Sequence, residues 1–196
     1  MLSWKIGHSL DPYVSTVAKW IIRRPVNPNI LTFGGLILNG VAGTLLALGH
    51  WYVGAFLILG AGLFDLLDGA MARNQGHVTH FGGFLDSVID RCSALLLFLG
   101  VLVFYLRSQG MEAIILAMLA LGGAMMVPYT RAKAETVISN CNVGVMERAE
   151  RILVLAAGAL FNCMVPVLWI IVILSHFTVA HRIYYTWREL RRSPTN

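Results

Sequence analysis

The sequence predicts an all-α, polytopic membrane protein with six transmembrane helices and an N-terminal amphipathic helix at the membrane surface. Hydrophobic residues make up 57% of the 196 residues, charged residues make up 13%, and the mean hydropathy is +0.70. A soluble domain carries about 25% charged residues, so this chain has too little polar surface to be one. The same composition excludes intrinsic disorder, which requires few apolar residues and high charge. Apolar stretches of about 20 residues, long enough to span a bilayer, follow one another along the chain.

Residues 1–28 predict a helix that lies on the membrane surface. Apolar residues recur near helical spacing between Leu10 and Ile22, and basic residues are interleaved with them. This pattern is typical of interfacial amphipathic helices, and a solvated basic leader is the alternative. Pro28 is expected to end this segment, and Asn29 can cap the helix that follows.

The rest of the chain, residues 29–196, is expected to form one membrane domain of six helices. The predicted spans cover residues 30–48, 51–73, 84–106 and 113–135, and two more spans flank a break near 162–166. Basic residues favour the cytoplasmic side of short loops, and six spans place nearly all of them there. Five spans would place the four C-terminal arginines on the opposite side. Both chain ends and the active site are therefore expected to face the cytoplasm, in the cell membrane.

Four of the ten acidic residues lie within 26 residues of one another, at Asp65, Asp68, Asp86 and Asp90. Spacings of three and four place each pair on one face of a helix. The two helices are consecutive and antiparallel, so all four carboxylates are expected at similar depth near the cytoplasmic surface. Ionisable residues inside membrane segments are costly, which makes them candidates for a functional site.

The acidic cluster predicts a divalent-metal site. Four carboxylates in a medium of low dielectric constant repel one another unless cations neutralise them. Oxygen ligands without nearby histidine or cysteine select Mg²⁺, Mn²⁺ or Ca²⁺, and two such ions suit phosphoryl transfer. Gly69 and the pair Gly82–Gly83 allow a phosphate to approach the backbone, and Arg73 offers a cation to a diphosphate. The alternative is that the acids only form ion pairs with Arg73 and Arg91.

The residues Asp65-Leu-Leu-Asp68-Gly69-Ala-Met-Ala-Arg73, followed at fixed spacing by Gly82, Asp86 and Asp90, resemble the signature of the CDP-alcohol phosphotransferase family. The resemblance implies an enzyme that transfers a phosphatidyl group from a CDP-linked lipid, such as CDP-diacylglycerol, to an alcohol and releases CMP. It also implies a homodimer of six-helix subunits. Asp65, Asp68 and Asp86 would hold two Mg²⁺ ions, or Mn²⁺ in their place, and Asp90 would be the general base and lie close to the second ion.

The same resemblance implies a set of residues that contact the CDP-lipid. They are Pro28, Asn29, Ile30, Leu31, Gly69, Arg73 and Thr79.

Basic residues near the loop between spans four and five, and after span six, bear on the acceptor alcohol. A phosphorylated acceptor would be bound by cations, and the candidates are Arg131, Lys133, Arg151 and Arg191. For any one of them, the cytoplasmic excess of basic residues is an equally good reading.

The segments Arg131-Ala-Lys133-Ala-Glu135 and Gly144-Val-Met-Glu147-Arg148-Ala-Glu-Arg151 resemble the phosphatidylinositol phosphate synthase branch of the family, which implies inositol 1-phosphate as the acceptor. Glycerol 3-phosphate is the alternative, but members that use it more often carry Arg and Lys where this chain has Gly35 and Arg91. A synthase of archaeal type, with an ether-lipid donor, shares the signature.

Two other classes of protein are alternatives to this interpretation. Intramembrane prenyl transfer also uses aspartate-bound metals, but with a different spacing of acids. A cation transporter would distribute acids along a pathway rather than near one surface. The net charge of +5 is assigned to topology and lipid headgroups rather than to nucleic acid. The three cysteines match no zinc pattern or disulfide framework.

Overall fold

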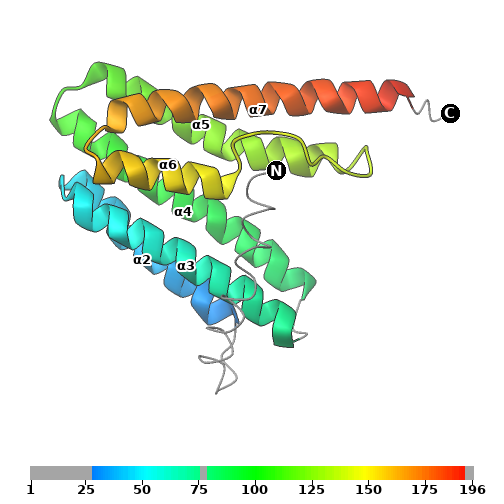
Figure 1. Cartoon of the computed structure of the whole chain (residues 1–196), viewed down its shortest axis with the longest axis horizontal. Coiled ribbons are helices and arrows are strands. Elements are labelled where there is room, and N and C mark those ends of the chain that lie inside the picture. The colour runs from blue at the N-terminus through cyan, green and yellow to red at the C-terminus, as the bar shows by residue number, and fades with distance from the viewer. Residues whose placement is uncertain (1–27, 76–78, 193–196) are drawn as a thin grey trace. The chain divides into compact units, whose positions relative to one another are not determined.

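The computed structural model describes residues 28–75 and 79–192, with the backbone alone for 28, 29 and 66–75. In this part of the chain every regular element is a helix, so the predicted all-helical class is confirmed there (Figure 1). The amphipathic helix expected in residues 1–28 falls, except for Pro28, outside the described residues. The helices are α2 (Pro28–Ala47), α3 (Trp51–Gln75), α4 (His80–Arg107), α5 (Met111–Ala134), α6 (Arg148–Leu160) and α7 (Met164–Arg192).

Among the residues with described side chains, four helices are long and apolar enough to cross a membrane. The four windows are Ile30–Ala47, His80–Arg107, Met111–Ala134 and Met164–Arg192. In α3 the described side chains end at Asp65, and the part from Trp51 to Asp65 is a shorter apolar stretch. The helix α6 has 13 residues, so it is about 20 Å long and shorter than a full hydrocarbon core. The break predicted near 162–166 is present as the turn between α6 and α7.

The chain divides into two compact units, residues 1–104 and 105–196. In the first unit, α2 and α3 form an antiparallel hairpin (Figure 1). Gly49 turns the chain between them at a φ of +83°, in the left-handed region that glycine adopts without steric cost. The ring of Trp51, at the start of α3, lies edge-on to Phe104 of α4 with centroids 4.6 Å apart.

The helices α2 and α4 cross at two glycines that allow their backbones to touch. A Cβ on Gly43 would lie 2.5 Å from the carbonyl oxygen of Leu96, and one on Gly100 would lie 2.7 Å from the carbonyl carbon of Gly43. Small residues at such crossings let membrane helices pack closely, because lipid supplies no hydrophobic force that drives helices together.

The second unit is built on α7, which packs against both α5 and α6. Glycines again mark the contacts, since a Cβ on Gly123 would lie 2.7 Å from Ser175 Cβ, and one on Gly158 would lie 2.9 Å from Val167 Cγ1. The side of α7 that faces its neighbours carries the buried residues Met164, Val167, Leu168, Ile171, Ser175, Thr178 and Arg182.

Candidate active site

The four predicted acids all lie on helices of the first unit, and the backbone sets their register. Asp65 is ten residues before Gln75, the end of α3, and Asp90 is ten residues after His80, the start of α4. At 1.5 Å per residue, both lie about 15 Å from the short link that joins the two helices. At the other end, the contacting rings of Trp51 and Phe104 are fourteen residues from Asp65 and Asp90 respectively. The antiparallel pair thus brings Asp65 and Asp90 to one level.

The other two acids lie about one helical turn nearer to the link. Asp68 is seven residues before Gln75, and Asp86 is six residues after His80. The side chains of Asp65, Asp86 and Asp90 are each half-buried, whereas for Asp68 the structure describes the backbone only. Among the described side chains, no three of His, Cys, Asp and Glu come together as a metal site. The donor chemistry of the three described acids, all carboxylate oxygens, fits a hard divalent cation.

The helix α2 lies against Asp65 at Gly35. A Cβ on Gly35 would lie only 3.2 Å from Asp65 Oδ1, so the carboxylate rests against the bare backbone of α2. One turn on either side, Thr32 and Asn39 are buried, with 6% and 2% of their surfaces exposed. The amide Nδ2 of Asn39 donates a hydrogen bond of 3.0 Å to the Gly35 carbonyl. The sequence analysis gave Thr32, Gly35 and Asn39 no role beside the acids. The signal in the sequence was two polar residues, Thr32 and Asn39, at helical spacing inside an apolar span.

Thr79, just before α4, and Arg91, within it, both make hydrogen bonds to the backbone of that helix. The Thr79 hydroxyl accepts a hydrogen bond of 2.9 Å from the Gly82 backbone amide, and the Thr79 carbonyl accepts one of 3.1 Å from Gly83. Thr79 is therefore the N-cap of α4. Arg91, which the alternative reading paired with acids, donates from Nη1 to the carbonyl of Ser87 on its own helix.

In the second unit, Arg131 at the end of α5 is held by polar partners from the loop that follows. Its Nε donates to Glu135 Oε1 at 3.0 Å, and its Nη2 donates to Asn142 Oδ1 at 2.7 Å. Nη1 lies 3.9 Å from Glu147 Oε1. An anionic acceptor at Arg131 would meet a cation that carboxylates already surround.

A second arginine, Arg182, contacts the same glutamate, Glu147, and we call these three residues the Arg131–Arg182 cluster. The sequence analysis used Arg182 only as evidence for the membrane topology. Arg182 of α7 is 2% exposed, and its Nη2 donates to Glu147 Oε1 at 3.3 Å. Its Nε and Nη1 donate to the carbonyls of Val143 and Val127 at 2.8 and 2.6 Å. The glutamate therefore lies between Arg131 and Arg182. The signal in the sequence was an arginine that ends a run of thirty uncharged residues.

The other predicted acceptor residues lie in three different settings. Arg151 is buried in the first turn of α6, and Lys133 is exposed on α5. Arg191 is exposed on the last turn of α7, and its guanidinium carbon lies 4.0 Å from the centroid of the Trp187 ring. The described contacts thus connect Arg131 with Arg182 and leave Arg191 apart from them.

Besides Arg182, a hydroxyl group of α7 also holds the α5–α6 loop. Thr178 Oγ1 accepts hydrogen bonds from the backbone amides of Val145 and Met146, at 3.2 and 3.1 Å, and donates one of 2.7 Å to the Leu174 carbonyl. Its single donor and both acceptor sites are therefore used. Gly144, with φ at +130°, passes so close that a Cβ there would lie 2.5 Å from Thr178 Cγ2.

We expect Thr178→Val to loosen this loop, because valine keeps the shape but leaves the part-buried amide of Val145 and the buried amide of Met146 without an acceptor, at a cost of about 1–3 kcal/mol. Hydrogen exchange of Val145 and Met146 should accelerate in the purified protein, measured by mass spectrometry of the loop peptide. Thr178→Ser keeps the hydroxyl and should preserve the protection. Equal exchange in both variants would contradict the assignment.

Comparison with known proteins identifies the family. A sequence model described as CDP-alcohol phosphatidyltransferase matches residues 25–181, a region that contains all four acids and Arg131 and ends one residue before Arg182. The chain belongs to the CDP-alcohol phosphatidyltransferase family. It is therefore a transferase, and its apolar helices are those of a multi-pass membrane enzyme.

Relatives within the CDP-alcohol phosphatidyltransferase family match nearly the whole chain. An archaetidylinositol phosphate synthase of Pyrococcus horikoshii is 35% identical, over 97% of this chain and 98% of its own. One of Methanothermobacter thermautotrophicus is 33% identical, over 87% of this chain and 93% of its own. A phosphatidylinositol phosphate synthase of Mycobacteroides abscessus is 30% identical, over 91% and 83%.

Solved structures of one family member have the same fold. The phosphatidylinositol phosphate synthase of Mycobacterium tuberculosis with CDP-DAG bound matches at a TM-score of 0.78 and 27% identity, over 89% of this chain and 93% of that one. The same enzyme in complex with manganese and citrate matches at a TM-score of 0.79, over 89% and 88%. The resemblance read from the acidic motif is thus confirmed at the level of the family.

Proposed function

We propose that this protein transfers a phosphatidyl group from CDP-diacylglycerol to inositol 1-phosphate and releases CMP, as a step of phospholipid synthesis. The observation that carries the proposal is the register of α3 and α4, which brings Asp65 level with Asp90 in a chain of this family. The relatives named above, which make inositol phosphate lipids, support the choice of acceptor. The identity to archaeal relatives supports an ether-lipid donor as the second candidate.

In this proposal Asp65, Asp68, Asp86 and Asp90 hold two Mg²⁺ ions, with Mn²⁺ able to replace them. The M. tuberculosis structure with manganese supports a divalent metal in the family. When bound, the metal would neutralise the diphosphate and stabilise both the attacking and the leaving oxygen.

The chain's own residues supply the proton transfer and the binding. Asp90 takes the proton from the acceptor hydroxyl, whose oxygen forms a bond to the phosphorus of the lipid phosphate. The bond from that phosphorus to the bridging oxygen breaks, and its electron pair leaves with CMP. The residues proposed to hold the CDP-lipid are Pro28, Asn29, Ile30, Leu31, Gly69, Arg73 and Thr79.

For the acceptor phosphate we propose Arg131, Lys133 and Arg151, and we add Arg182 as a residue that positions Glu147. Arg182 is buried, and its three guanidinium nitrogens donate to Val143, Val127 and Glu147, so it holds Glu147 beside Arg131. Arginine suits a phosphate because its planar donors can bind two oxygens at once. Arg191 is left out because it is nine residues from Arg182 and projects from the opposite, exposed face of α7.

The finer architecture is also proposed. It consists of an amphipathic helix in residues 1–28, six membrane helices in 29–196, both chain ends and the active site on the cytoplasmic side of the cell membrane, and a homodimer. The distribution of basic residues supports the orientation. Accessibility labelling of Cys92 and Cys163 from each side of sealed vesicles tests it, and cross-linking in membranes tests the dimer.

A CMP-release assay on the purified protein tests the proposed function. With Mg²⁺ and CDP-diacylglycerol, inositol 1-phosphate should support release of CMP well above inositol, glycerol 3-phosphate or serine. Repeating the assay with a dialkyl donor separates the acyl from the ether lipid. Faster release with glycerol 3-phosphate would favour the phosphatidylglycerophosphate synthase alternative. Absence of CMP with every acceptor, in Mg²⁺ or Mn²⁺, would refute the proposal and reopen the cation-transporter reading.

Gly35→Ala should weaken metal binding, because the new methyl group would lie 3.2 Å from Asp65 Oδ1 and push the carboxylate aside. Changes behind a metal ligand typically cost 10–100-fold in affinity, so we expect the half-saturating Mn²⁺ concentration to rise roughly tenfold. Electron paramagnetic resonance of Mn²⁺ bound to the purified protein measures it. Gly34→Ala is the matched control, since its Cβ would lie 3.9 Å from the Phe64 ring, an ordinary contact. Equal affinities in the two variants would show that residue 35 does not position Asp65.

A further inference from the structure

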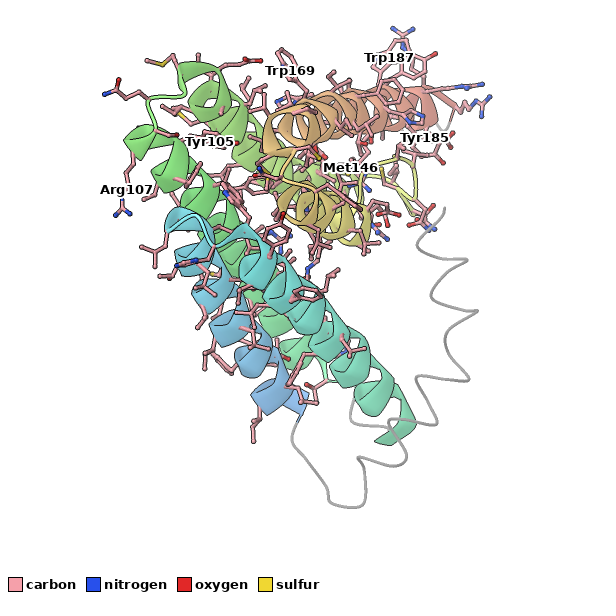
Figure 2. All side chains as sticks on the ribbon, turned by 60° about the vertical axis from the view of Figure 1, so that its left-hand side comes forward. Tyr105, Arg107, Met146, Trp169, Tyr185 and Trp187 are labelled. Atoms are coloured by element: carbon pink, nitrogen blue, oxygen red, sulfur yellow. The ribbon has the colours of Figure 1, made fainter. Side chains whose placement is uncertain are left out.

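The outer face of α7 changes character along its length. Opposite its buried side, the helix carries a stripe of exposed residues that begins at Trp169 and ends at Arg191. Trp169 and Trp187 are eighteen residues apart, which is five helical turns, so their side chains share one face. Figure 2 shows both indoles on the same side of the helix. The exposed side chains between them are Ile170, Ile173, His176, Phe177, Ala180, Ile183 and Tyr184.

The spacing of the two tryptophans matches a bilayer. Eighteen residues at 1.5 Å each correspond to about 27 Å, close to the hydrocarbon thickness of about 30 Å. Tryptophan is enriched at both membrane–water interfaces, where its ring lies among the headgroups. Trp169 has a polar partner of its own, since its Nε1 donates to Glu112 Oε1 at 2.9 Å. The two indoles therefore mark the two interfaces, and Trp187 lies at headgroup depth.

The residues around Trp187 form a cationic and aromatic end to the stripe. Arg191 lies over the Trp187 ring at 4.0 Å, and Tyr184 packs beside the same ring with centroids 5.9 Å apart. Arg188 and Arg192 are also exposed, and the only acid in Ile183–Arg192 is Glu189, 3.5 Å from Arg192. A guanidinium stacked on an aromatic ring keeps its N–H donors at its edge, where phosphate oxygens can accept them.

We propose that Trp187, Arg188 and Arg191 bind the headgroup of an anionic phospholipid at the membrane surface. The alternative role of Arg191, at the acceptor phosphate, conflicts with its position on the helix. Arg191 is nine residues, or two and a half turns, from the buried Arg182, so the two side chains project from opposite faces of α7. The inference does not depend on which alcohol the enzyme uses.

Fluorescence quenching of the full-length protein in vesicles tests the proposal. The probes are brominated phosphatidylglycerol and brominated phosphatidylcholine, and the signal of Trp187 is the difference between the protein and its Trp187→Phe variant. We expect phosphatidylglycerol to quench Trp187 at a lower mole fraction than phosphatidylcholine. Anionic surfaces attract each basic residue by about 1 kcal/mol, so the preference should fall roughly fivefold for each of Arg188→Gln and Arg191→Gln, and salt should reduce it.

The control and the contrary outcomes are defined by the same assay. Arg107→Gln, which removes an exposed arginine from the end of α4, should keep the preference for phosphatidylglycerol. Equal quenching by the two lipids would overturn the proposal. So would protection of Trp187 that rises with protein concentration, which indicates a second copy on this face. A raised KM for the phosphorylated acceptor in Arg191→Gln, with unchanged lipid preference, would overturn it as well and place Arg191 at the acceptor.

Discussion

Asp90→Asn is expected to lower the rate of CMP release by about a hundred- to ten-thousand-fold, the contribution that a general base typically makes. Asparagine has almost the size of aspartate but accepts no proton from the acceptor hydroxyl at neutral pH. Binding of CDP-diacylglycerol should be largely intact, because the contacts proposed for the lipid lie on other residues. The measurements are the CMP release rate at saturating Mg²⁺ and the Kd of the lipid.

Glu112→Gln is the matched control for this substitution. It also exchanges a carboxylate for an amide, but at the start of α5, where the side chain accepts a hydrogen bond from Trp169 that an amide oxygen can also accept. Its activity should equal that of the unmodified protein. A Mg²⁺ titration separates the two roles of Asp90, because loss of a metal ligand alone would be recovered at higher Mg²⁺. An Asp90→Asn protein with full activity would remove the base from the mechanism.

Gly100→Ala should destabilise the first unit strongly. The added methyl group would lie 2.7 Å from the carbonyl carbon of Gly43 and 2.9 Å from its Cα, and these are backbone atoms that no side-chain rotation can move. Overpacking of a well-packed site costs about 1–3 kcal/mol and occasionally more, and here α2 and α4 would have to separate. We expect a lower midpoint of thermal unfolding by circular dichroism, and lower activity, since the same helices carry Gly35 and Asp90.

Gly62→Ala distinguishes this steric effect from the general effect of replacing a helical glycine. A Cβ at Gly62 in α3 would meet nothing within 4 Å, so the substitution should leave stability unchanged or raise it by about 0.5–1 kcal/mol through helix propensity. If both variants unfold at the same temperature, the close approach of α2 and α4 does not contribute to stability.

The register of the four acids could be predicted from the sequence, and the physical reason is local. Spacings of three and four residues within Asp65–Asp68 and Asp86–Asp90 determine a shared face on any α-helix. A link of four residues between the helices makes them antiparallel neighbours, so the level of the two pairs follows by counting from the link. The role of Gly35 did not follow, because it depends on the distance between α2 and α3, which no spacing within a helix specifies.

The position of the arginines in the second unit depended on packing in the same way. Arg131 and Arg182 are fifty-one residues apart, and Arg182 and Arg191 are separated by nine. Because Arg182 and Arg191 are close in sequence, the sequence analysis treated the C-terminal arginines as one group. In the structure, Arg182 is buried against the α5–α6 loop, whereas Arg191 faces outward on Trp187. Nine residues are two and a half turns of a helix, so the buried cation and the exposed one project from opposite faces of α7.

The sequence by itself determined the membrane class, the helical content and the family-defining acids. These features depend only on how the residues interact with water, with lipid and with the backbone of their own helix. Only the tertiary structure decided which residues face which neighbours. Gly35 touches Asp65, Gly43 touches Gly100, and Glu147 lies between Arg131 and Arg182. Each of these depends on two helices, or a helix and a loop, approaching within van der Waals distance. Such an approach is set by the packing of many side chains together rather than by any one segment of the chain.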